Sequence, residues 1–167
     1  MKAYLPFLLM PLVALLQSSF VSQLSMLNIK PDTLLIALTC WGMLAGTRQA
    51  VLWAFLGGSV LDILSGAPLG VSALALTPLA AFSLAAELKL LESGVILAAV
   101  ACFIGTFAYY AVFEFVLLSV REQPGWPPDL LATIFPAATI NMVLTPLFFW
   151  LVKYISGRMA PSYQVPG

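Results

Sequence analysis

The stretch L-D-I-L-S-G-A-P-L-G, residues 61–70, ends a long apolar run with one carboxylate, Asp62, followed at once by a turn of small residues and proline. A charged side chain costs about 2.5–3.5 kcal/mol at the centre of a bilayer and less toward its surface, so such residues usually face the protein interior and pair with a partner. The placement of Asp62 therefore predicts a buried acid with defined hydrogen-bond donors.

The residues after Asp62 have the composition of a tight turn. Gly66 and Gly70 permit backbone angles that other residues resist, whereas Pro68 fixes one angle and has no amide. We predict that Asp62 accepts hydrogen bonds from the Ser65 hydroxyl and from backbone amides of the turn, because buried polar groups are normally hydrogen-bonded. These bonds would fix the angle between the helices on either side. A role of Asp62 in transport or catalysis is the alternative.

The composition indicates an integral membrane protein. Of the 167 residues, 62% are hydrophobic and 8% are charged, against about 25% charged in soluble domains. The net charge of zero gives no reason to expect nucleic-acid binding. The absence of histidine excludes histidine acid–base chemistry and histidine metal sites. Because no nucleophile–base pair, phosphate loop or metal-ligand spacing is present, we predict a protein without enzymatic activity, cofactor or metal.

Six apolar runs are separated by breaks that carry nearly all the charge. They cover residues 4–20, 33–45, 50–64, 71–86, 95–120 and 130–152. A helix needs about 20 residues to cross a hydrocarbon core of roughly 30 Å. We therefore predict an all-α, compact six-helix transmembrane bundle as one domain over residues 1–155, with a flexible tail at 156–167. The run at 33–45 is short, which indicates a tilted or re-entrant helix, or one packed against protein.

The distribution of lysine and arginine predicts the orientation in the membrane. With six spans and an inner N-terminus, five of the seven cationic residues are cytoplasmic and two are external, which favours cytoplasmic termini. The cytoplasmic set is Lys2, Arg48, Lys89, Lys153 and Arg158, and the external pair is Lys30 and Arg121. In this topology the turn after Asp62 lies on the outer side.

Glu114 is a second acid inside an apolar run, at a predicted depth similar to that of Asp62. Two carboxylates facing one cavity could relay protons or bind a cation. A polar contact between helices is the interpretation that we favour, with Tyr109 and Tyr110 one turn away as possible donors.

Pro31 and Asp32 open the run at 33–45. Proline lacks an amide that a helix start leaves unpaired, and an acid suits the positive end of the helix dipole, so we predict that this pair caps the helix.

Small residues recur in G-M-L-A-G (42–46) and in Gly57-Gly58, where they favour close packing of helices within the chain. Three prolines are predicted to interrupt helices: Pro78, Pro136 and Pro146.

Two segments carry a family resemblance. The stretches P-D-T-L-L-I-A-L (31–38) and G-G-S-V-L-D-I-L-S-G-A-P-L-G-V-S-A-L (57–74), with Trp41 between them, resemble the rod shape-determining protein MreD family. Length and number of apolar runs agree over nearly the whole chain. The matching motif positions are Pro31, Asp32, Gly57, Asp62, Ser65, Gly66, Pro68, Leu69 and Gly70.

The resemblance implies a multi-pass scaffold in the bacterial cytoplasmic (inner) membrane that belongs to the cell-elongation (rod) complex and supports cell shape and peptidoglycan synthesis. The implied partners are a bitopic MreC-like protein, RodA with a class B penicillin-binding protein, MreB indirectly, and membrane lipid.

The family is also similar to the substrate-binding subunits of energy-coupling-factor transporters. This similarity gives the alternative function, capture of a vitamin for import, in which Asp62 and Glu114 would contribute to an outward-facing pocket.

Overall fold

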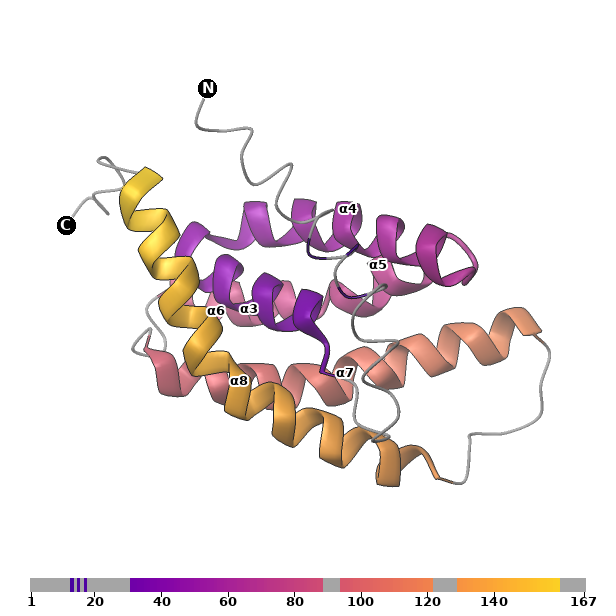
Figure 1. Cartoon of the computed structure of the whole chain (residues 1–167). Helices are drawn as coiled ribbons and strands as arrows, with labels where there is room; N and C mark the ends of the chain where they lie inside the picture. Colours follow the sequence, from indigo (N-terminus) through magenta and orange to yellow (C-terminus); the bar gives the residue numbers. More distant parts are fainter. Residues whose placement is uncertain are drawn as a thin grey trace.

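The computed structural model describes residues 31–88, 94–121 and 129–159, together with Val13, Leu15 and Gln17. The elements in these ranges are helices (Figure 1). In chain order they are α3 (Thr33–Ala45), α4 (Thr47–Ser65), α5 (Val71–Leu76), α6 (Leu79–Glu87), α7 (Val95–Arg121) and α8 (Leu130–Met159). Apart from the three single residues, the predicted first span at 4–20 lies outside the described residues, as do Lys2, Lys30 and Lys89. The prediction of an all-α fold is confirmed for the described part of the chain.

Helix α3 is the centre of the bundle. It contacts α4, α6, α7 and α8, and most of its side chains are buried, including Leu34, Leu35 and Leu38. Its 13 residues span about 20 Å, which is shorter than the roughly 30 Å of a hydrocarbon core. Protein therefore surrounds this short apolar helix, which agrees with one of the interpretations of the run at 33–45.

Close helix packing depends on glycines at three positions. A side chain at Gly58 would collide with the backbone of Ala73, so this glycine lets α4 and α5 lie against each other. A Cβ at Gly57 would lie 3.1 Å from Leu34 of α3. A Cβ at Gly42 would meet Ser83 of α6. These contacts confirm that the small residues serve packing within the chain.

The prolines behave in two ways. The predicted interruption at Pro78 is confirmed, because α5 ends at Leu76 and α6 begins at Leu79. Pro136 and Pro146 lie inside α8, which is continuous from Leu130 to Met159, so the helix predicted over 130–152 is confirmed and a kink at either proline stays a prediction. Each proline removes only one backbone hydrogen bond, and α8 is held along its length by α7 and α3. This helix extends to Met159, so the first four residues of the predicted tail are helical.

Within the described residues, two helices are long and apolar enough to cross a membrane, and they lie side by side in opposite directions (Figure 1). The candidate spans are Val95–Val120 in α7 and Leu130–Ile155 in α8. Many large apolar side chains on both helices are exposed, as expected for surfaces that face lipid. A complete set of six spans stays a prediction.

Candidate functional site: two buried polar centres

The first polar centre joins the end of α4 to the start of α5. Asp62 is completely buried, and its Oδ2 accepts a hydrogen bond of 2.7 Å from the backbone amide of Gly70. Its Oδ1 accepts one of 3.0 Å from the amide of Ser72. Both carboxylate oxygens are therefore held by backbone donors from beyond the turn. We call Asp62, Gly66, Gly70 and Ser72 the Asp62 corner.

The amide donors to Asp62 were predicted, but the predicted bond from the Ser65 hydroxyl is wrong. The Ser65 Oγ instead donates to the backbone carbonyl of Asp62 over 3.4 Å. Ser65 follows Asp62 by three residues on the same helix, where a serine hydroxyl reaches the backbone carbonyl of the preceding turn. The carboxylate is directed away from this turn, toward α5.

Two glycines give the corner its shape. Gly66 ends α4 in the left-handed conformation at φ 69°, and Gly70 precedes α5 at φ 97°. Residues with a Cβ adopt these angles at a cost of roughly 1–2 kcal/mol, which explains the requirement for glycine. Pro68 contributes its carbonyl, which accepts a hydrogen bond from Val71. Leu69 is 74% exposed and does not contribute to the buried centre.

Glu114 has different surroundings from Asp62. It is only half-buried on α7, and its carboxylate lies close enough to Tyr110 for an electrostatic interaction. Both carboxylate oxygens of Asp62 accept hydrogen bonds from the backbone amides of Gly70 and Ser72. A joint role of Asp62 and Glu114 stays a prediction. Among the residues that the structure describes, no three His, Cys, Asp or Glu side chains gather in a way that could hold a metal ion.

The second polar centre joins α3, α7 and α8. Asn141 is completely buried, and its Oδ1 accepts a hydrogen bond of 2.9 Å from the backbone amide of Asp32. Its Nδ2 donates to the Thr106 hydroxyl over 3.1 Å. The hydroxyls of Thr106 and Thr145, also completely buried, donate in turn to the backbone carbonyls of Cys102 and Asn141.

Gln17 adds the N-terminal segment to this centre. Its Oε1 accepts hydrogen bonds from the Leu34 amide at 2.7 Å and from the Thr33 hydroxyl at 3.1 Å. Its Nε2 donates to Asp32 Oδ1 over 3.0 Å. We call Gln17, Asp32, Thr106, Asn141 and Thr145 the Asn141 cluster.

The prediction that Asp32 lies at the start of α3 is confirmed, and a contribution of its charge to the helix dipole stays a prediction. Asp32 occupies the N-cap position but makes no capping bond with its side chain. Gln17 accepts the hydrogen bond from the helix-start amide of Leu34 instead. The Asp32 carboxylate faces Gln17 and lies near the phenol of Tyr110, while an acceptor from another segment, Gln17 Oε1, satisfies the helix start.

Sequence reasoning did not identify Gln17, Thr106 or Asn141. A signal was present for the two amides, since Gln17 is the only amide side chain in the run 4–20 and Asn141 the only one in 130–152. A lone amide inside an apolar run usually forms hydrogen bonds across helices.

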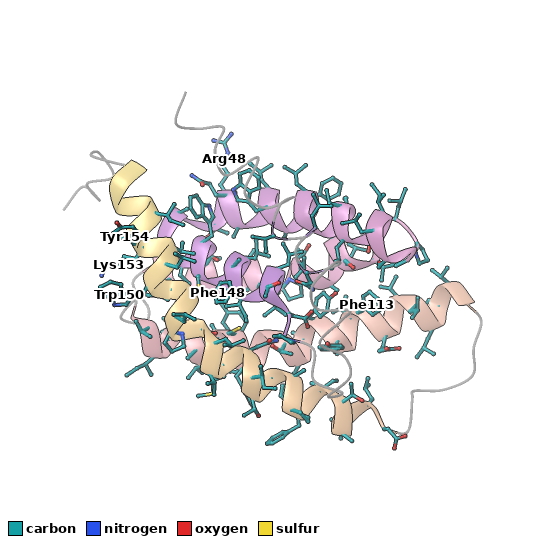
Figure 2. All side chains as sticks on the ribbon, viewed as in Figure 1. Arg48, Phe113, Phe148, Trp150, Lys153 and Tyr154 are labelled. Carbon is teal, nitrogen blue, oxygen red and sulfur yellow. The ribbon has the colours of Figure 1, made fainter. Side chains whose placement is uncertain are left out.

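Aromatic side chains of α7 lie between the two centres. Tyr109 is buried, lies within electrostatic reach of both Asp32 and Asp62, and is close to Ser72. Its ring contacts that of Tyr110 with centroids 5.4 Å apart, and it stacks on Phe113 at 5.8 Å. Phe113, labelled in Figure 2, is partly buried against the core.

Comparison with known proteins identifies the family. No solved structure matches this chain. The family model described as rod shape-determining protein MreD matches residues 1–156, which is nearly the whole chain. The chain therefore belongs to the MreD family, a family of membrane proteins with a role in rod shape determination.

Proposed function

We propose that this chain is a non-enzymatic scaffold of the cell-elongation complex in the bacterial inner membrane. It binds a bitopic MreC-like protein and through it supports peptidoglycan synthesis by RodA and a class B penicillin-binding protein, with MreB attached indirectly. The main support is that the buried polar side chains of the described residues join helices to one another, as in a framework that holds its helices in fixed positions.

The outer surface supports a role in helix-to-helix binding. Large apolar side chains are exposed on α7 and α8, including Phe115 and Trp150. In a membrane, helices associate through close packing and hydrogen bonds between their surfaces. This association does not need a water-soluble domain. The chain needs no soluble region to bind the transmembrane helix of a partner.

The arrangement of charged residues supports a multi-pass topology with both termini in the cytoplasm. Arg48 at the start of α4 and Lys153 near the end of α8 lie toward the same end of the molecule (Figure 2). Trp150 and Tyr154 are exposed at this end, where interfacial aromatics are typical. The Asp62 corner lies at the opposite end, which is the outer side in this topology (Figure 1).

The transporter alternative receives no support from Asp62. A residue that captures a solute needs polar atoms that the solute can reach. The carboxylate of Asp62 is completely buried, and both of its oxygens accept hydrogen bonds from the protein.

Affinity purification of the full chain in a mild detergent tests the scaffold function. We expect the tagged chain to retain the MreC-like protein encoded by the same organism, and cells depleted of the chain to lose their rod shape. A matched purification of an unrelated polytopic protein is the control. Retention of no partner, together with unchanged shape after depletion, would contradict the proposal.

Reporter fusions at both termini, active only in the cytoplasm, test the topology.

A further inference from the structure

Helix α8 has two distinct faces. Its inner face is buried against the bundle and carries Ala138, Asn141, Thr145 and Phe149. The opposite side exposes Thr139, Val143, Leu147 and Trp150, which we call the α8 outer face. The three apolar side chains among them are 68–71% exposed.

A proline on the outer side leaves one backbone carbonyl of this helix without its helical donor. Pro146 is exposed and has no N–H, so it cannot donate to the carbonyl of Met142, four residues earlier. The nearby hydroxyls of Thr139 and Thr145 are directed elsewhere, to the carbonyls of Phe135 and Asn141. No side chain among the described residues donates to Met142.

The depth of this carbonyl makes its missing donor costly. Met142 follows the start of the candidate span, Leu130, by 12 residues and precedes its end, Ile155, by 13. At 1.5 Å per residue, the carbonyl is about 18–20 Å from either end of the span, beyond the reach of interfacial water. The carbonyl that Pro136 frees belongs to Ala132, only two residues from the start of the span, where water and lipid headgroups supply donors.

We propose that the α8 outer face binds the transmembrane helix of the bitopic partner, and that a Ser, Thr, Asn or Gln side chain of that helix donates a hydrogen bond to the Met142 carbonyl. This inference rests on the proposed function and assigns the surface that carries it. A backbone carbonyl without a donor costs free energy in hydrocarbon, so an N–H or O–H group opposite it stabilises the complex. Lipid acyl chains have neither, whereas polar side chains of membrane helices form such bonds across interfaces.

The substitution Pro146→Ala tests the hydrogen bond. Alanine restores the amide that pairs with the Met142 carbonyl inside the helix, so the isolated chain should unfold at the same or a higher temperature. Its affinity for the partner should fall roughly three- to tenfold, the value of one interhelical hydrogen bond in a membrane. Pro136→Ala is the matched control, and we expect it to change the affinity less than twofold. Equal affinities of Pro146→Ala and wild type would overturn the proposed bond.

Disulfide cross-linking in native membranes tests the surface. Val143→Cys and Leu147→Cys are introduced singly after both native cysteines are replaced by alanine, and the partner carries single cysteines along its transmembrane helix. We expect cross-links from these two positions and none from Phe55→Cys, a control on α4 that is 63% exposed.

The remaining outcomes distinguish failure of the assigned binding surface from failure of the scaffold function. Cross-links from Val143→Cys only to a second copy, only to a further cysteine introduced within residues 1–30 of the same chain, or to nothing while the partner is still retained, would overturn the assigned surface and leave the scaffold function intact. A wild-type chain that retains no partner would overturn the scaffold function and this inference together.

Discussion

The Asp62 corner and the Asn141 cluster place polar groups inside the same apolar bundle, but they do so over very different distances along the chain. Asp62 binds amides only 8 and 10 residues later, all within the hairpin of α4 and α5. Asn141 binds Asp32 at the start of α3, 109 positions earlier, and Thr106 on α7, 35 positions earlier. The corner is a property of one local segment, whereas the cluster exists only when three distant helices have packed together.

The largest effect should come from removing the acid of the local corner. Asp62→Leu leaves the buried amides of Gly70 and Ser72 without acceptors, and each unsatisfied donor costs about 1–3 kcal/mol. We expect the free energy of unfolding to fall by roughly 2–5 kcal/mol, measured by reversible unfolding in detergent or bicelles.

Asp62→Asn is the matched control for this experiment. Its carbonyl oxygen keeps one of the two acceptors, so its loss of stability should be about half of that for Asp62→Leu. Identical stability of Asp62→Leu and wild type would show that the corner does not lock α4 against α5.

The next largest effect should come from the long-range cluster. Asn141→Leu removes the acceptor of the Asp32 amide and the donor to Thr106, with an expected loss of about 1–3 kcal/mol in the same measurement. Thr106→Val removes the acceptor of Asn141 Nδ2 and a bond within α7 to the Cys102 carbonyl, but it keeps the bond between Asn141 and Asp32 and should cost less. If Thr106→Val destabilises the chain as much as Asn141→Leu, the link between α8 and α3 contributes nothing.

Removal of the cap on α3 should have a smaller effect. Gln17→Met keeps the size of the side chain but leaves the Leu34 amide without its acceptor, at about 1–2 kcal/mol. Amide hydrogen exchange gives the sharper measurement, because exchange at Leu34 should accelerate while exchange at Ser72 in the Asp62 corner stays unchanged. Acceleration at both amides would show that the two centres are not independent.

The smallest effect should come from the backbone of the corner. Gly66→Ala and Gly70→Ala each place a Cβ in open space, so the cost is limited to the left-handed conformation, about 1 kcal/mol. Gly66→Asn should cost less, because asparagine tolerates this conformation better than alanine does. Thermal unfolding in detergent distinguishes the three variants. A loss well above 2 kcal/mol for either alanine would reveal a contact at the turn that the open space around these glycines does not predict.

The features that the sequence predicted correctly depend on near neighbours. The run 33–45 has the same bounds as α3, and the amide donors to Asp62 follow from a turn of glycine and proline within ten residues. Pro78 lies between two short helices, where its missing amide and its ring end one helix and begin the next.

The features that the sequence did not predict depend on tertiary packing. The role of Gln17 as the cap of α3 and the bond between Asn141 and Asp32 require knowledge of which helices meet.

The long separation between Asp32 and Asn141 has a consequence for biosynthesis. Ribosomes add about 5–20 residues per second, so Asn141 is made roughly 5–20 s after Asp32. During that interval α3, too short to cross the hydrocarbon core as a stable independent span, has to be held at the insertion machinery or by earlier helices. Helix α8, made well after α3, thus completes the interior, and a chain truncated before α8 should be a substrate for membrane quality-control proteases.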